Sequence, residues 1–232
     1  MSADLFRGWE LYDRITRANH MRHAETEAGV RAALARRAGP LRVLDLGCGD
    51  GRVAADVLAW SRVVGYVGVD LSAGALDLHA RRPVPGSCPG EVARRLVCGD
   101  IAEVIVALPD GAFDLVLAGF SLHHFPTDRK AGILDDIARV LAPDGWFIWT
   151  DTYRREGESR DAFLARLFVE VRTTWVAATP DEREQFVAHI GEFDHPEPLS
   201  WMTAQLAARG LARAEVLYRD EFYVSLIGSR GL

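Results

Sequence analysis

The chain has 232 residues with 27 basic and 33 acidic side chains, a formal net charge of −6. This length fits one domain, or one domain with an elaboration, and buries a core without disulfides or metal. The acidic balance disfavours a large nucleic-acid footprint, because phosphate binding needs a basic face. The polar start is no signal peptide, and no apolar run reaches the ~18 residues of a spanning helix. We therefore expect a cytoplasmic protein that does not engage a membrane.

The first half of the chain alternates between helical and extended patterns. Residues 3–37 are helical in tendency, since apolar residues recur at helical spacing until Gly39-Pro40 stops them. Ser72 is a candidate cap for a later helix. The pattern predicts, in chain order, strand 41–46, helix 52–60, strand 63–69, helix 73–81, loop 83–90 and strand 93–98.

The second half continues this alternation and then changes character. The predicted elements are strand 113–118, a helix starting at Thr127, turn 143–145, strand 146–150, two helices within 154–195, helix 197–209, and strands 212–219 and 221–227. Short strands that are apolar on both faces indicate a parallel sheet covered on both sides. We therefore predict an α/β fold, a doubly wound, seven-stranded, mostly parallel sheet with a C-terminal antiparallel hairpin and helices on both faces.

Two helical additions flank or interrupt this plan. We expect residues 1–38 to form an N-terminal helical cap and residues 39–232 to form the main domain. Within that domain, residues 154–195 are predicted to be an inserted helical lid. The three cysteines, Cys48, Cys88 and Cys98, lack metal-ligand spacing, so we expect free thiols and no metal site.

A glycine-rich loop follows the first strand, with the sequence Gly47-Cys-Gly-Asp-Gly51. Doubly wound sheets bind ligands at this place, beyond the carboxyl ends of the strands. The nicotinamide fingerprint needs a third Gly or Ala at position 52, which is Arg52 here. Asp45 precedes the loop by two residues, and an acid there suits a ligand that carries an ammonium group better than a pyrophosphate.

With these residues, the stretch 41–152 resembles the class I S-adenosylmethionine-dependent methyltransferases. The resemblance implies that Gly47 and Gly49 contact the cofactor by backbone and that Asp45 supports the loop and the amino end. Asp70 resembles the acid that binds both ribose hydroxyls, and it lies 21 residues after Gly49. The resemblance also implies cofactor contacts for Leu71 and Ile101 on the adenine ring, Asp100 at the adenine amino group, and Gly119.

The N-terminal cap offers two further candidates for the cofactor. Tyr12 and Arg22 lie in the predicted helical region, and Arg22 could bind the cofactor carboxylate by charge-assisted hydrogen bonds. For each of them, a surface position without a cofactor contact is the alternative.

The segment after the fourth strand contains His123 and His124, where the resembled family lines its transfer site. A histidine takes a proton near neutral pH, which helps if the acceptor is a hydroxyl. We favour His123 as that base over His124, and the alternative is a histidine that points into the core. His195 completes the predicted catalytic set, and Asp151, Tyr153 and His189 are further candidates around the acceptor.

The lid composition bears on the class of acceptor. It carries six arginines against nine acids, which is not an RNA-binding surface. Its aromatic residues suit the wall of a pocket for a small apolar acceptor, or they simply pack the lid. The Asn/Asp-Pro-Pro-aromatic signature of exocyclic amine methylation is absent after the fourth strand.

We therefore predict methyl transfer from S-adenosylmethionine to a small molecule, at oxygen, by in-line displacement. The alternatives are a tRNA or protein methyltransferase and a non-catalytic, cofactor-binding regulatory module. The expected assembly is a monomer or a homodimer that binds no nucleic acid.

Overall fold

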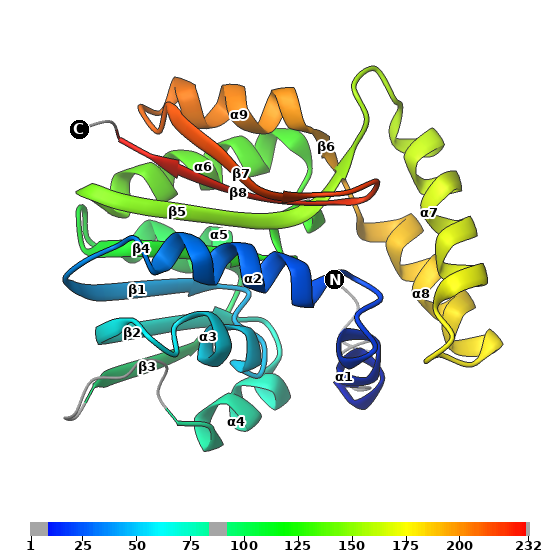
Figure 1. The fold of residues 1–232 in the computed structure, drawn as a ribbon, viewed down its shortest axis with the longest axis horizontal. Coiled ribbons are helices and arrows are strands. Elements are labelled where there is room, and N and C mark those ends of the chain that lie inside the picture. The colour runs from blue at the N-terminus through cyan, green and yellow to red at the C-terminus, as the bar shows by residue number, and fades with distance from the viewer. Residues whose placement is uncertain (1–8, 84–91, 231–232) are drawn as a thin grey trace.

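A computed structural model describes residues 9–83 and 92–230, with the side chains of residues 9 and 10 left out. One sheet forms its centre, in the strand order β3-β2-β1-β4-β5-β8-β7 (Figure 1). The first five of these strands are parallel, and β8 runs antiparallel to both β5 and β7. A two-residue strand, β6, also pairs with β5. The predicted fold class is confirmed, with β6 as an addition.

The described elements are bounded as follows. The strands are β1 (Pro40–Leu46), β2 (Arg62–Asp70), β3 (Ala93–Cys98), β4 (Phe113–Gly119), β5 (Leu141–Arg154), β6 (Glu197–Pro198), β7 (Arg213–Arg219) and β8 (Tyr223–Ser229). The helices are α1 (Trp9–Arg17), α2 (His23–Leu34), α3 (Arg52–Val57), α4 (Ala73–Arg81), α5 (Ile101–Val104), η2 (Ile105–Ala107), η3 (Leu122–His124), α6 (Thr127–Val140), α7 (Arg160–Thr174), α8 (Pro180–Phe193) and α9 (Leu199–Ala208).

Both faces of the sheet are covered because alternate residues of its central strands point to opposite sides. In β1, Leu44 and Leu46 join a buried cluster with α5, α6 and α9, whereas Leu41 and Val43 join a second cluster with α2 and α3 (Figure 1). This period-2 alternation in an apolar strand is what a sheet between two helical layers requires.

The lid and the N-terminus meet in a third buried cluster. Ile15 of α1 packs with Phe163, Leu167 and Trp175 of the lid, beyond the carboxyl ends of the parallel strands (Figure 1). In contrast, Val30 of α2 packs on the sheet. Within the predicted cap, α1 and the turn that follows it therefore lie with the lid, and Met21 and His20 of that turn contact it as well. The division into a cap and a main domain stays a prediction.

Two local predictions differ from the structure, and a third falls largely outside the described residues. The helical region splits after Arg17 and restarts at His23, with Asn19 and Arg22 in the left-handed conformation. The turn 143–145 lies inside β5, whose pairing with β4 shifts register between Phe113 and Leu115. Such an irregularity inserts extra residues into a strand without ending it. The predicted loop lies outside the described residues except for its first residue, and so does Cys88.

The other two cysteines are free, with Cys48 buried and Cys98 exposed. Within residues 9–83 and 92–230, the helices are all too short or too polar to cross a membrane.

Candidate functional site

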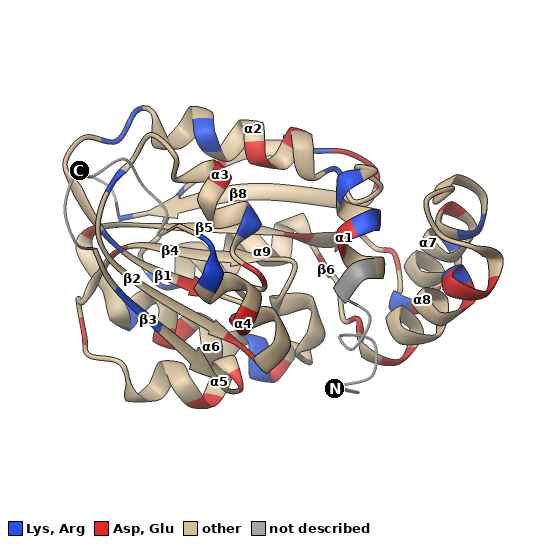
Figure 2. Ribbon diagram, turned by 90° about the horizontal axis from the view of Figure 1, so that it is seen from below, with Lys and Arg blue, Asp and Glu red and all other residues tan. Residues whose placement is uncertain are grey.

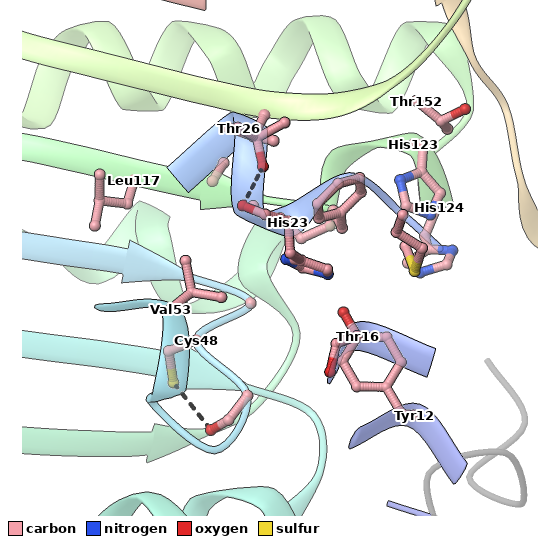
Figure 3. A pocket seen from close by; sticks show the side chains of 18 of the residues that line it. Tyr12, Thr16, His23, Thr26, Cys48, Val53, Leu117, His123, His124 and Thr152 are labelled. Carbon is pink, nitrogen blue, oxygen red and sulfur yellow. Dashed lines mark hydrogen bonds between the residues drawn. The ribbon is translucent and has the colours of Figure 1, made fainter. Parts of the chain in front are cut away.

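A cavity opens between the carboxyl ends of the parallel strands and the helices α1, α7 and α8. Figure 3 shows residues that line it, among them Tyr12 and Thr16 of α1. Its walls come from the ends of β1, β2, β4 and β5 and from the helices α1, α2, α7 and α8. The register of the sheet explains this meeting, because Leu46 pairs with Val69 on one side and Ala118 on the other. The residues that follow these three strands must therefore lie side by side.

The glycine loop forms one end of the cavity. Gly47 has a φ of +77°, and its backbone N donates to Val69 O at 2.8 Å. A Cβ on Gly47 would lie 2.5 Å from Ser121 Cβ, so the loop and the segment after β4 approach as closely as glycine permits. Gly51 also has a positive φ, and a Cβ there would lie 2.6 Å from the ring of His79. The loop needs glycine for both conformation and space.

Asp70, the last residue of β2, fixes the loop from the neighbouring strand. Its Oδ2 accepts from the backbone N of Gly49 at 2.8 Å, and its Oδ1 accepts from that of Ser72 at 2.8 Å. Burial raises the pKa of Asp70, although the backbone donors oppose this shift. Each carboxylate oxygen keeps a second lone-pair direction, so the side chain can still accept from a ligand.

Asp45 lies behind the loop and is buried. Tyr66 donates to its Oδ2 at 2.6 Å. Burial raises the pKa of Asp45 to about 7, and the charge of Asp70 adds to this, while the Tyr66 hydroxyl opposes it. A carboxyl group in this state gains from a cationic ligand, which would favour its ionised form.

Glu27, Arg52 and His23 form a cluster next to the glycine loop that the sequence did not reveal. Arg52 donates two hydrogen bonds to the Glu27 carboxylate, at 2.8 and 3.2 Å. Burial alone raises the pKa of Glu27, but hydrogen bonds from His23 and Arg52 outweigh burial and lower this pKa to about 2. The two charges join α2 to the start of α3, 25 residues away, and no local pattern marks such a pair.

The chain turns sharply where β4 ends. Phe120 has a φ of +51°, which costs a residue with a Cβ about 1–2 kcal/mol. Its ring packs against His23 and Tyr223, with centroids 4.8 and 5.7 Å away. Ser121 Oγ donates to Leu46 O at 2.9 Å. Because of this turn, the two histidines of η3 line the cavity.

His123 is buried and bound to Asp151 of β5. Its Nδ1 contacts Asp151 Oδ1, and its backbone N donates to Asp151 Oδ2 at 3.1 Å. Trp149 Nε1 and the backbone N of Thr152 donate to the same carboxylate, at 2.9 and 3.0 Å. Burial raises the pKa of Asp151, but His123 and these donors outweigh it, so the pKa is lowered and the carboxylate is ionised.

Asp194, which follows α8, was not among the predicted site residues. Its Oδ1 lies 3.6 Å from His123 Nε2 and 3.4 Å from His124 Nδ1. The ring of His189 packs on that of His124, with centroids 5.6 Å apart. His195 does not line the cavity, and its backbone N donates to His123 O at 2.7 Å. Seventy residues separate the two segments, so only folding brings them together.

Comparisons with known proteins agree with this geometry. Residues 44–149 match the family described as a methyltransferase domain. The chain is 30% identical over 130 residues to a probable methyltransferase of Aspergillus luteorubrus, covering 55% of this chain and 45% of that protein. It is 34% identical over 114 residues to a fatty-acid O-methyltransferase of Mycolicibacterium smegmatis, covering 49% of this chain and 38% of that protein.

Solved structures share the whole fold. The YcgJ protein of Bacillus subtilis superposes with a TM-score of 0.59 at 18% identity, covering 88% of this chain and 97% of that one. In its matched stretch, residues 44–149, and in its fold, the chain therefore resembles the class I S-adenosylmethionine-dependent methyltransferases. The magnesium protoporphyrin IX methyltransferase of Synechocystis, solved with bound S-adenosylhomocysteine, superposes with a TM-score of 0.63 at 16% identity, covering 97% and 94% of the two chains. The curated relatives are longer, since the chain spans less than half of either one.

The residues at the loop end of this methyltransferase domain fit S-adenosylmethionine. Asp70 ends β2 with lone pairs available for hydroxyl groups, and Asp45 offers a buried carboxyl group to an ammonium group. Gly47, Gly49 and Gly119 line the cavity, as the sequence predicts for a backbone cradle. Glycine at position 47 lets the loop pack directly on Ser121 while it lines the cavity, which is the structural reason for this fit.

The remaining predicted cofactor residues of the methyltransferase domain divide into two groups. Tyr12, Leu71 and Ile101 line the cavity. Asp100 does not, because its carboxylate accepts from the backbone N of Ala102 at 2.8 Å and caps α5.

Arg22 also lies outside the lining of the cavity. It precedes α2 with a φ of +57° and pairs with Asp220 at 3.3 Å and with Glu25 at 3.8 Å. Arg52, in contrast, lines the cavity and directly follows the glycine loop, so of the two arginines it is the one at the cofactor end.

Proposed function

We propose that this chain transfers the methyl group of S-adenosylmethionine to an oxygen atom of a small, mostly apolar acceptor. The cofactor supplies an electrophilic methyl carbon on a sulfonium centre. The observation that carries the proposal is a single cavity with two unlike ends. Carboxylates and loop glycines line one end, and histidines with apolar lid residues line the other.

The cofactor end has one group for each polar part of the ligand. We assign Asp70 to the ribose hydroxyls and Asp45 to the ammonium group, through the loop in front of it. Arg52 is our candidate for the cofactor carboxylate in place of Arg22, because Arg52 lines the cavity and presents a planar, charged donor. Leu71 and Ile101 of the wall are assigned to the adenine ring, while Asp100 is engaged in capping α5.

The acceptor end favours an apolar body. Trp175, Phe186 and Ile190 of the lid face the cavity together with Phe120 and Tyr223 of the core. Pockets with apolar walls and a few polar groups bind small molecules. Methyl transfer by in-line displacement depends mainly on holding the acceptor atom in line with the methyl group and the leaving sulfur.

The polar groups at this end favour oxygen as the methylated atom. A hydroxyl acceptor loses its proton on methylation, and an imidazole within reach can accept that proton. The histidines of η3 lie at this position. One curated relative is a fatty-acid O-methyltransferase, whose name places methylation on an oxygen of a small apolar molecule.

A nucleic-acid acceptor fits the lid poorly. Basic and acidic residues are interspersed along α7 and α8 (Figure 2), and the acids of the lid outnumber its arginines. Such a surface does not attract a polyanion. A small neutral acceptor has no such conflict.

A turnover screen tests the proposal. Purified chain with S-adenosylmethionine is offered phenols, carboxylic acids, alcohols and amines, and S-adenosylhomocysteine release is measured with the mass of each product. We expect methylated oxygen in at least one apolar phenol or acid. Methylation of amines alone would contradict the choice of oxygen. Tight binding of S-adenosylhomocysteine without turnover on any class would favour the regulatory module.

A further inference from the structure

The lid supplies a carboxylate to the transfer site, and its position distinguishes the two histidines of η3. We propose that Asp194 is a positioning residue that holds His124, and not His123, as the proton-accepting imidazole. This inference rests on the proposed methyl transfer to oxygen. It also reverses the preference that the sequence suggests.

Both nitrogens of His123 face carboxylates. Its Nδ1 contacts Asp151, and its Nε2 lies 3.6 Å from Asp194 Oδ1. The side chain is buried between two carboxylates that belong to different elements, β5 and the segment after α8. An imidazole held in this way is favoured in its protonated form, so it is an acid partner of the network and not a free base.

His124 faces a carboxylate with one ring nitrogen only. Its Nδ1 lies 3.4 Å from Asp194 Oδ1, and neither atom has a closer hydrogen-bond partner among the described residues. The ring points into the cavity near Tyr12 and Thr16 of α1 (Figure 3). A carboxylate at Nδ1 selects the tautomer with hydrogen on Nδ1, which leaves the lone pair on Nε2 to accept a proton. Such contacts commonly shorten when a substrate binds.

The charges around the pair point the same way. Burial lowers the pKa of His123, but Asp194 and Asp151 outweigh it and raise this pKa. Burial and the neighbouring His123 lower the pKa of His124, and Asp194 only partly opposes them. Other titratable groups that act on the pair include His189 of α8, Lys130 of α6 and Asp70 at the end of β2. Neighbouring groups whose pKa values are pushed apart can divide acid and base roles.

The backbone around Asp194, where the chain leaves α8 and returns to the sheet, is held by two cationic side chains. Arg160 of α7 donates to the carbonyl oxygens of Gly191 and Asp194, both at 2.6 Å. On the other side, Lys130 Nζ donates to His195 O at 2.6 Å. The lid must therefore lie against the sheet for the carboxylate to reach His124.

The test compares Asp194→Asn with a matched control, Asp181→Asn. Asp181 lies in the first turn of the same helix α8 and is exposed. We expect Asp194→Asn to lower kcat at least ~10-fold, as loss of an orienting partner does, and to leave the affinity for S-adenosylhomocysteine unchanged. The low-pH limb of the kcat profile should move to lower pH, because His124 loses the negative charge that raises its pKa. Asp181→Asn should change neither property.

A second measurement does not depend on knowing the acceptor. Nitrogen NMR of the imidazole rings reports which nitrogen carries hydrogen, and His124→Gln assigns the resonances. We expect His124 of the native chain to carry hydrogen on Nδ1 and to lose this preference in Asp194→Asn. An unchanged tautomer and an unchanged kcat profile in that variant would overturn the inference. If the native chain methylates no acceptor while the tautomer responds as expected, the proposed function fails and the positioning role stands.

A third arm addresses metal binding. His123, His124 and Asp194 offer ligand atoms within 4.8 Å of one another, which matches a two-histidine, one-carboxylate donor set. We expect no stoichiometric binding of Zn²⁺ or Fe²⁺ in calorimetry at neutral pH. Binding that is stoichiometric in the native chain and lost in Asp194→Asn would overturn the proposal, since Asp194 would then be a metal ligand.

Discussion

The two ends of the cavity are built in different ways. The cofactor end depends on the glycine loop and Asp70 at the end of β2, where N–H groups of the loop backbone donate to Val69 O and to the Asp70 carboxylate. The acceptor end depends on η3, β5 and the segment after α8, which are far apart and meet through side chains. In the proposed function, the cofactor is therefore held mainly by backbone geometry, whereas the acceptor lies against side chains that distant segments bring together.

The largest expected effect is a loss of stability next to the acceptor end. Lys130 Nζ donates to Glu197 Oε1 at 3.1 Å, and both side chains are buried. Lys130→Met leaves the Glu197 carboxylate buried without its nearest cation, so the free energy of unfolding should fall by about 3–5 kcal/mol. Urea denaturation measures this change. Arg129→Met, at an exposed neighbouring position, should cost no more than about 0.5 kcal/mol, and equal losses in the two variants would refute the importance of the buried pair.

A substitution at the cofactor end should lower the affinity for the cofactor. Asp70→Ala removes the acceptor for two backbone N–H groups and for the assigned ribose hydroxyls. Hydrogen bonds to a charged group contribute about 1.5–3 kcal/mol each, so the affinity for S-adenosylhomocysteine should fall at least ~100-fold in calorimetry. Asp77→Ala, exposed on α4, is the control. Unchanged affinity in Asp70→Ala would remove the ribose role.

The contact between the two ends is tested at Gly47. Gly47 and Gly111 both have positive φ, but only Gly47 has a close neighbour, Ser121. Alanine at either position should cost about 1–2 kcal/mol for its backbone conformation. Gly47→Ala should cost a further 1–3 kcal/mol, roughly, for the displaced segment after β4. If the two variants are equally stable in thermal denaturation, the segment after β4 can shift away from the loop without a cost in stability.

The smallest effect concerns pH at the cofactor end. Asp45, with its pKa raised to about 7, is mainly protonated below that pH and then cannot balance the ammonium group of the ligand. The affinity for S-adenosylhomocysteine should therefore fall about 10-fold between roughly pH 8 and pH 6, since one pKa unit corresponds to a factor of ten. In Asp45→Asn the affinity should be flat over this range. An equal slope in both proteins would assign the pH dependence to another group.

Most of the fold could be predicted because its signals are local. Apolar strands, the cap Ser72 and the glycine loop each express their structure within a few residues. The start of β5 was misplaced because Leu141 already pairs with Phe113 of β4, and pairing resumes at Trp146 after the irregular stretch Pro143 to Gly145. That early pair is a tertiary contact, which turn chemistry in the sequence does not reveal.

The site could be predicted only in part for the same reason. The sequence analysis selected Arg22 as the cation for the cofactor carboxylate, but packing decides that Arg52 lines the cavity and that Arg22 pairs with Asp220. His195 looked like an acceptor residue, but its backbone supports His123, and the neighbouring Asp194 carries the side chain that reaches the histidines.

The sequence by itself determined the parallel sheet, the glycine loop and the acid at the end of β2. These follow from strand periodicity and from backbone conformations that few residues allow. Only the tertiary structure decided which charged groups meet: Glu27 with Arg52, His123 with Asp151, and Asp194 with His124. Charged groups become partners when they are close in space. These partners are 25 to 70 residues apart in the chain, so no local sequence pattern marks them.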